Sequence, residues 1–278
     1  MKLTVVIPIY KESLSKDELA SLLQCFSVLK DWTFCFIAPK SLHQDYYKSL
    51  AQQNGVKSSF ELFEDKDFTS VNSYSKLLLD VNFYKRFTDY DFIFLYQLDG
   101  WVFRDELNYW CEQDYDYIGA PWFKGYDKAD ENSPFISPSG NGGVSLRKIQ
   151  TFIETLSKKN EQKNRRWKNF KRISQENLNI SKGILKLPSR LRKLAKIYLS
   201  YENSIDYAFN TMNEDYIIVN IFPKINKKFK IAPNNINYKF SFEVNPEKLY
   251  NMNNKKLPFA CHAHKKYGID FWNKFIDI

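Results

Sequence analysis

The feature that most constrains the fold is a regular alternation of short apolar segments and amphipathic segments over the first 98 residues. Apolar segments rich in β-branched and aromatic residues, as expected of buried strands, occupy residues 3–10, 32–39, 58–64 and 92–98. Segments with apolar residues near helical spacing lie between them, at residues 16–30, 43–55 and 70–87. This rhythm predicts an α/β fold of the Rossmann type, with a mostly parallel sheet flanked by helices.

The ends of two predicted strands are the first candidates for a site, because open parallel sheets bind ligands at the carboxyl ends of their strands. Pro8 and Tyr10 end the first strand, and Asp99 ends the fourth. A carboxylate there costs several kcal/mol unless it is solvated, hydrogen-bonded or paired with a cation. Asp99 therefore either caps a turn with Gly100 or faces a ligand, such as a divalent metal on a nucleotide diphosphate.

The net charge of +9 is unevenly distributed. Residues 158–197 hold 14 Lys and Arg against two acids, a local balance of +12 that leaves −3 for the other residues. We therefore expect a basic helical insertion at residues 156–200 between a core at residues 1–155 and a part at residues 201–278 that completes it. Its interleaved Leu, Ile, Lys and Arg favour an anionic membrane surface as partner, with a solvated basic face or nucleic acid as alternatives.

The cysteines and the N-terminus bear on the compartment. Cys25, Cys35, Cys111 and Cys261 lack paired spacing and are typical of reduced, mostly buried thiols. The N-terminal apolar run is too short for a secretory signal, and no apolar stretch is long enough to span a bilayer. These features predict a cytoplasmic protein, peripheral on the inner face of the membrane if the basic segment binds there.

A glycine-rich segment covers residues 137–148. Its three glycines permit positive φ and close approach to a ligand, and Asn141 adds a short polar group. The spacing matches neither common phosphate-loop pattern, so a phosphate loop and an ordinary loop before a helix near Leu146 both stay open.

Two further groups carry titratable side chains. Glu214 and Asp215 stand at the start of a helix-like run, where acids favour the helix dipole and where a general base would also sit. His262 and His264 alternate, so in a strand they would face the same side, as metal ligands or packed side chains.

Taken together and in order, these motifs resemble GT-A-type glycosyltransferases. More closely, the chain is similar to a bacterial glycosyltransferase-like family known mainly as an uncharacterised domain. The resemblance rests on "YSKLLLD", "FYKRF", "YDFIFLYQLDGW", "YDYIGAPW", "NGGVSLR", the "NED" box and the "HAH" segment. It covers roughly residues 1–155 and 201–272, and it implies transfer of a sugar from a nucleotide-sugar donor to a glycan or lipid-linked acceptor in surface polysaccharide synthesis.

The resemblance also implies roles for individual residues. Asp99 matches the last acid of a metal-binding motif whose first acid is replaced by Gln97, so the need for Mn²⁺ or Mg²⁺ stays open. His262 or His264 matches the late histidine that completes metal or diphosphate binding, and His262 is taken as the metal ligand. Glu214 or Asp215 matches the base of an inverting enzyme. The residues implied in donor binding are Pro8, Tyr10, Lys11, Tyr74, Lys76, Asp99, Asn141, Gly142, Gly143 and His264.

Two other function classes remain open at this point. A nucleotidyltransferase would also use strand-end acids and a metal, but it would be expected to carry a more basic loop after the first strand than Lys11 alone. A non-catalytic module that binds carbohydrate or nucleic acid is the other. Trp101, Trp122 and Tyr126 are candidates for stacking on sugar faces. We expect a nucleotide sugar and a saccharide acceptor as partners, and no nucleic acid.

Overall fold

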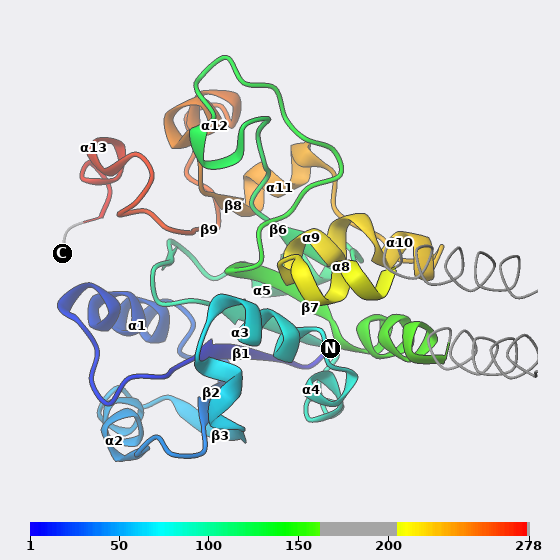
Figure 1. The fold of residues 1–278 in the computed structure, drawn as a ribbon. Coiled ribbons are helices and arrows are strands. Elements are labelled where there is room, and N and C mark those ends of the chain that lie inside the picture. The colour runs from blue at the N-terminus through cyan, green and yellow to red at the C-terminus, as the bar shows by residue number, and fades with distance from the viewer. Residues whose placement is uncertain (162–204, 277–278) are drawn as a thin grey trace, which may run out of the picture.

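The computed structural model describes residues 1–161 and 205–276, and its centre is a six-stranded sheet of order β3-β2-β1-β4-β7-β6 (Figure 1). β1, β2, β3 and β4 are parallel to one another, and β7 runs antiparallel to both of its neighbours. The strands are β1 (Leu3–Pro8), β2 (Thr33–Pro39), β3 (Lys57–Phe63), β4 (Phe92–Tyr96), β6 (Tyr117–Gly119) and β7 (Val144–Lys148). The predicted mostly parallel α/β sheet is confirmed.

Helices cover both faces of this sheet, because successive strand residues point to opposite sides. Val5 and Ile7 pack into one apolar cluster, whereas Val6 between them packs into another. The first cluster is covered by α1 (Lys16–Val28), α2 (Asp45–Gln53) and α5 (Leu107–Glu112). The second is covered by α3 (Val71–Leu78), α4 (Val81–Lys85), the helix at residues 149–161, α8 (Ile205–Thr211), α9 (Glu214–Asn220) and α10 (Phe222–Ile225).

Two predicted helices differ from the structure. The single helix expected at residues 70–87 is divided into α3 and α4, because the Asp80 side chain accepts a hydrogen bond from the Asn82 backbone N–H and starts a new helix. The helix expected near Leu146 begins at residue 149 instead. Residues 144–148 form β7, since their backbone groups pair with both β4 and β6.

A second, three-stranded sheet lies beside the first and has the order β5-β9-β8 (Figure 1). Its strands are β5 (Trp101–Val102), β8 (Ser241–Phe242) and β9 (Ala260–Cys261), and β8 is parallel to β9. The short helices α11 (Asn234–Phe240), α12 (Pro246–Met252) and α13 (Ile269–Trp272) accompany it, with 3₁₀ turns at Asp65–Phe68 and Tyr126–Lys128 elsewhere. Because β8 and β9 are parallel, the residues that follow them emerge at the same edge.

The chain order places a crevice between β1 and β4. From β1 the chain moves outward through β2 to β3, and β4 then returns to the other side of β1. At such a reversal the loops after the two adjacent parallel strands diverge and leave room for a ligand.

Several other predictions concern regions away from this crevice. The four cysteines are free and buried, as expected. In the described ranges, no helix has the length and apolar character needed to cross a bilayer. The predicted basic module at residues 156–200 lies, from residue 162 onward, outside the described residues, and so does most of the segment proposed to meet a membrane.

Candidate active site at the carboxyl ends of the strands

A cavity of about 440 Å³ opens where β1 and β4 end. It is bordered by the loops after these two strands, by α1, and by the segment that leads into α3. Its lining residues are Pro8, Ile9, Tyr10, Lys11, Leu14, Glu18, Tyr47, Phe68, Thr69, Ser70, Val71, Tyr74, Gln97, Leu98 and Asp99. The cavity therefore combines apolar and aromatic lining residues with polar ones, and we call the part formed by Gln97 and Asp99 its polar end; the other polar lining residues are Lys11, Glu18, Thr69 and Ser70.

At that polar end, residues from both sheets converge on His262. Its Nε2 lies 3.3 Å from Asp99 Oδ1 and 3.3 Å from Gln97 Oε1, while its Nδ1 lies 2.9 Å from Glu243 Oε1. Gln97 and Asp99 follow β4, whereas Glu243 and His262 follow β8 and β9. We call Gln97, Asp99, Glu243 and His262 the strand-end cluster.

The protonation of this cluster follows from its hydrogen bonds. Burial acts to lower the pKa of His262, but the hydrogen bonds to Asp99 and Glu243 outweigh it and raise the pKa to about 10. Burial acts to raise the pKa of Asp99, and the hydrogen bond and positive charge of His262 hold it below its ordinary value. In the protein alone, the imidazolium thus bridges two carboxylates.

The same donor atoms fit a divalent cation. Neighbouring ligand atoms of an octahedral ion lie about 3 Å apart when each is about 2.1 Å from the ion, close to the separations of His262 Nε2 from Asp99 and Gln97. No cluster of three His, Cys, Asp or Glu suited to a metal occurs in residues 1–161 and 205–276, and the Gln97 amide oxygen is a further side-chain oxygen beside His262 Nε2. Glu243 then engages the other ring nitrogen, as carboxylates do beside metal-bound histidines.

The glycine-rich segment passes between this cluster and the acid pair. A Cβ on Gly143 would collide with the His262 ring, and one on Gly142 would collide with the Glu214 carboxylate. Neither glycine has a positive φ. The close approach of His262 to Gly143 and of Glu214 to Gly142, rather than a left-handed backbone, is therefore the reason that a side chain does not fit at either position. The Asn141 side chain fixes the loop, since its Oδ1 accepts the Gly143 N–H at 2.7 Å and its Nδ2 donates to Glu243 at 3.0 Å.

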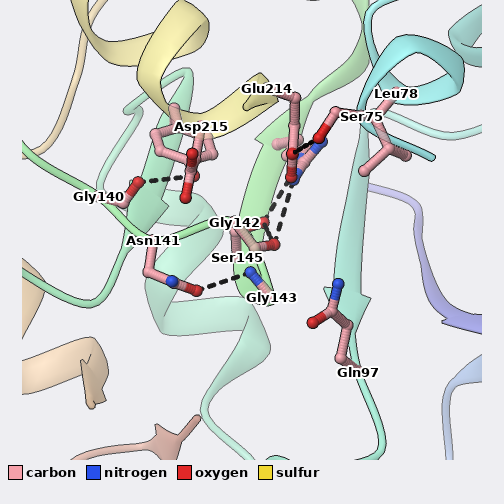
Figure 2. A network of polar contacts seen from close by, with 12 residues as sticks. Ser75, Leu78, Gln97, Gly140, Asn141, Gly142, Gly143, Ser145, Glu214 and Asp215 are labelled. Carbon is pink, nitrogen blue, oxygen red and sulfur yellow. Dashed lines mark hydrogen bonds and ion pairs between the residues drawn. The ribbon is translucent and has the colours of Figure 1, made fainter. Parts of the chain in front are cut away.

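The two acids at the start of α9 point in different directions (Figure 2). Glu214 accepts a hydrogen bond of 2.8 Å from Ser75 and pairs at 3.4 Å with Arg147, whose side chain is fully buried. Arg147 also donates to the Gly142 carbonyl and to the Tyr84 hydroxyl. Glu214 is thereby held inside the fold, and we call Ser75, Tyr84, Arg147 and Glu214 the arginine cluster.

Asp215 is half-buried on the other side of the loop, and a Cβ on Gly142 would lie 3.3 Å from its Cβ. Its carboxylate accepts the Tyr216 backbone N–H at 2.7 Å. Burial and the negative charges of Glu214 and Glu243 raise the pKa of Asp215 to about 7. Such a carboxyl exchanges protons near neutral pH, as a general base requires.

Comparisons with known proteins place the chain in a family. A family model described as "Protein of unknown function (DUF5672)" matches residues 57–262, well over half of the chain. The chain belongs to this family. No curated protein matches the DUF5672 chain in sequence.

Solved structures similar to the DUF5672 chain include three glycosyltransferases of low identity. GlyE from Streptococcus pneumoniae TIGR4 has a TM-score of 0.48 at 10% identity, with 95% of this chain and 54% of that one covered. Core-mannan synthase A from Aspergillus fumigatus, solved in an Mn/GDP form, has a TM-score of 0.41 at 9% identity, with 55% of this chain and 60% of that one covered. A glycosyltransferase involved in glycosylation of the major capsid of PBCV-1 has a TM-score of 0.40 at 10% identity, with 94% of this chain and 92% of that one covered. The DUF5672 chain thus spans little more than half the length of the first two.

The structure brings together most residues that the sequence suggested for the site. Pro8, Tyr10, Lys11, Tyr74 and Asp99 line the cavity. Asn141, Gly142 and Gly143 adjoin its polar end through the contacts described above. Lys76 is exposed on α3 and does not line the cavity.

The histidine pair differs from the predicted strand. β9 ends at Cys261, and Ala263 has a left-handed φ of 50°, so His262 and His264 are not on one face of a strand. His264 is buried, and its Nδ1 lies 3.0 Å from the Asp99 backbone carbonyl rather than in the cavity. Burial lowers the pKa of His264. His264 therefore supports the backbone that carries Asp99.

Aromatic residues near the site are mostly packed. Trp101 and Trp122 are each 9% exposed, and Trp101 contacts the His264 ring edge-on. Tyr126 is 50% exposed, so of these three residues only Tyr126 offers an open ring face.

Glu243 is the main residue that the sequence analysis missed. It follows β8, a strand of only two residues, in the sequence "FSFEVNP". An acid after an apolar alternation is the same signal that marked Asp99, but it is weak in so short a segment.

Proposed function

We propose that the chain is a GT-A-type glycosyltransferase that moves a sugar from a nucleotide-diphosphate donor to the hydroxyl of a saccharide acceptor. The observation that carries the proposal is that Gln97 and Asp99 of the strand-end cluster line a cavity that also has aromatic and apolar lining residues. A nucleotide sugar combines the same characters, with a flat base at one end and an anionic diphosphate between base and sugar.

The base and ribose would occupy the wall formed by Tyr10, Leu14, Phe68 and Tyr74. The hydroxyl of Tyr74 is buried and lies near the Gln97 side chain. A ligand oxygen at this position could hydrogen-bond to the hydroxyl. Tyr74 lines the cavity, and a ribose or phosphate oxygen is a suitable partner.

The diphosphate would lie at Gln97, Asp99 and His262. A Mn²⁺ or Mg²⁺ ion held by these three side chains would supply positive charge to the leaving diphosphate. Lys11 also lines the cavity, but its Nζ is paired with Glu18 Oε1 at 2.6 Å.

Asp215 would act as the base of an inverting displacement. As the acceptor oxygen bonds to the anomeric carbon, the bond from that carbon to the diphosphate breaks, the diphosphate leaves with the electron pair, and Asp215 takes the hydroxyl proton. Its pKa of about 7 suits this step near neutral pH. Glu214 is already committed to Arg147 and Ser75, which favours Asp215 over its neighbour.

The acceptor that we propose is a glycan or lipid-linked saccharide in bacterial surface polysaccharide synthesis. The basic composition of residues 158–197 supports it, since such a segment would hold a cytoplasmic enzyme at an anionic membrane surface. Sedimentation with anionic and with neutral vesicles, using the full chain and a variant with charges in this segment reversed, tests the attachment.

A nucleotidyltransferase is less well supported. It would need several cations for a triphosphate, whereas Lys11 is the only Lys or Arg among the described residues that line the cavity, and it is paired with Glu18.

The experiment is a panel of nucleotide sugars in which release of nucleoside diphosphate is measured for the wild type, Asp99→Asn and Asp89→Asn. Asp89 is an exposed carboxylate before β4 and serves as the matched control. We expect one donor to be turned over by the wild type and the control, and at least tenfold more slowly by Asp99→Asn. Absence of turnover with every donor, together with stabilisation of the fold by RNA alone, would overturn the proposal.

A further inference from the structure

A second cavity is a groove of about 1050 Å³ between residues 127–132, α12 and residues 266–271. It shares no lining residue with the cavity at β1 and β4. Figure 1 shows α12 beside the green loop that forms one wall. Sites for small molecules measure about 300–1000 Å³, so this groove, which we call the α12 groove, has room for a ligand of several linked rings.

The walls of the α12 groove are held to one another by the protein itself. Asn245 Nδ2 and Lys248 Nζ donate hydrogen bonds of 2.7 and 2.8 Å to backbone carbonyls of the loop at residues 127–133. Gly268 has a φ of +71° and passes so close to Pro246 that a Cβ would collide with the proline ring. The groove is therefore formed before a ligand binds, which lowers the cost of binding.

The cations of the α12 groove are already engaged. Lys248 and Lys266 are the only Lys or Arg among the described residues that line it. Lys248 Nζ bonds to the loop and lies 5.0 Å from the centre of the Phe123 ring. Lys266 Nζ lies 4.7 Å from the centre of the Tyr267 ring, and a hydrogen bond to the Tyr267 side chain is the main cause that raises the pKa of Lys266.

Four exposed carboxylates outnumber these two cations in the lining. They are Asp127, Glu131, Glu247 and Asp270. The resulting balance of −2 disfavours phosphates, nucleotides and acidic saccharides. Within residues 1–161 and 205–276, no group of three such side chains is placed to hold a metal ion, so the carboxylates do not form a cation site.

The uncharged groups of the lining match a saccharide. Asn132 and Asn251 are exposed amides, each of which both donates and accepts hydrogen bonds, and the carboxylates accept them from hydroxyl groups. Val244 and Met252 add apolar surface, and Met252 is 42% exposed. A sugar ring presents the complementary groups, with hydroxyls around its edge and C–H bonds on its faces.

The α12 groove adjoins the proposed reaction centre through Glu243. Val244 and Asn245, which line the groove, directly follow Glu243 in the chain. Glu243 is close enough to Lys266 and to Asp215 for its charge to act on the pKa of both, in addition to the hydrogen bond of Lys266 and the burial of Asp215. The groove therefore lies on the side of the molecule from which an acceptor chain would extend to the proposed base.

We propose that the α12 groove binds an uncharged oligosaccharide portion of the acceptor. The inference rests on the proposed function, because it names the class of saccharide that the second substrate carries. The carboxylates and amides of residues 127–132 and α12 bind the hydroxyl groups, and the surplus of carboxylates excludes saccharides that carry uronic acid or phosphate.

The test is binding of the full chain to an array of immobilised oligosaccharides, some built from neutral hexoses and N-acetylhexosamines and others containing uronic acid. The wild type is expected to bind neutral members and no acidic ones. Glu131→Lys is expected to weaken this binding about tenfold, because it removes an acceptor for hydroxyl groups. Asp89→Lys makes the same charge change before β4, outside the groove, and is the matched control, with wild-type binding expected.

A reversal of the charge preference tests the same groove by a gain. Asp127→Lys combined with Glu131→Lys changes the balance of the lining from −2 to +2. This double variant is expected to bind oligosaccharides that contain uronic acid at least tenfold more tightly than the wild type does. Because the gain requires a folded protein, it does not depend on loss of structure.

The acceptor role is tested by turnover. A neutral oligosaccharide that the wild type binds on the array is expected to increase the release of nucleoside diphosphate from the donor at least tenfold. No increase with any bound oligosaccharide overturns the acceptor role of the groove.

The other outcomes separate this inference from the proposed function. Unchanged neutral binding in Glu131→Lys, or no gain in the double variant, overturns the inference. Binding of an oligolysine peptide without binding of any oligosaccharide assigns the groove to a basic partner and also overturns it. If a nucleotide sugar is still turned over in these cases, the proposed function stands. Saccharide binding in the groove without turnover of any nucleotide sugar overturns the proposed function and the acceptor role with it.

Discussion

The strand-end cluster holds two carboxylates around one imidazole, the arginine cluster holds one carboxylate beside a guanidinium, and the two clusters lie on opposite sides of the Gly142–Gly143 segment. In the arginine cluster the cation is a guanidinium that is fully buried and bonded on all sides by protein. In the strand-end cluster it is an imidazole, and its partner Asp99 has a side chain that is 54% exposed in the cavity.

This difference shows what each cluster can do. A guanidinium cannot lose its proton, and no partner of Arg147 is open to the cavity, so the arginine cluster holds the loop and α9 in place. An imidazole can exchange a proton for a cation, and the exposed carboxylate can meet a ligand. We infer that the first cluster contributes stability and the second contributes binding, with Asp215 at the point where both meet the loop.

The largest expected effect separates the two neighbouring acids. Asp215→Asn should lower kcat about 10²- to 10⁴-fold with little loss of stability, because it removes the proposed base. Glu214→Gln should lower kcat by less than tenfold but lower the free energy of unfolding, because Arg147 then lacks its charge partner. Steady-state turnover and urea unfolding of both variants measure the contrast. Full turnover in Asp215→Asn removes this residue from the mechanism.

Removal of the buried cation tests the structural role directly. Arg147→Met should lower the free energy of unfolding by about 3–5 kcal/mol, since it leaves Glu214 buried without its cation. Arg86→Met breaks the half-exposed pair with Glu61 and should cost about 1 kcal/mol or less. Equal unfolding midpoints in the two variants would contradict the division between the clusters.

The two loop glycines sharpen the comparison, because each touches a different cluster. Gly143→Ala should weaken Mn²⁺ and nucleotide binding about tenfold or more, because the added Cβ would displace the His262 ring from its position beside Asp99. Gly142→Ala should instead lower stability, because its Cβ meets Glu214. Isothermal titration and thermal unfolding distinguish these results. The account is contradicted if Gly143→Ala binds ligand normally while Gly142→Ala keeps its melting temperature.

The last prediction is a dependence of stability on pH. The pKa of Asp215 is raised from 3.8 to about 7, so the folded protein holds this proton more tightly than the unfolded chain. Its contribution to stability is complete below about pH 4 and is lost as the pH rises through 7. Asp215→Asn, which does not ionise, should therefore raise the melting temperature relative to wild type at pH 8 and leave it unchanged at pH 4. Thermal unfolding of both proteins at pH 4 and pH 8 measures the difference. An equal increase in the melting temperature at both pH values would contradict the prediction.

How far the sequence could predict this arrangement depends on the range of the interactions involved. β1 to β4 follow from local apolar runs, and the position of Asp99 follows from the parallel order. The strand at residues 144–148 could not be predicted from a local apolar run, because its extended form depends on pairing with β4 and β6, which are distant in sequence.

The site shows the same limit. Sequence reasoning found both members of the Glu214–Asp215 pair but could not separate them, because Arg147 and Ser75 approach only Glu214 through the tertiary fold. Glu243 became recognisable only once β8 and β9 were adjacent. Lys76 is on the same helix as Tyr74, but its side chain is exposed and is not among the residues that line the cavity.

The most direct test is a crystal structure of the protein with the nucleoside diphosphate that it binds most tightly and Mn²⁺. The account predicts the base against Tyr10 and Tyr74, and the diphosphate beside Asp99 and His262. A nucleotide bound elsewhere, such as in the groove between α12 and residues 266–271, with Asp99 still paired to His262, would contradict it.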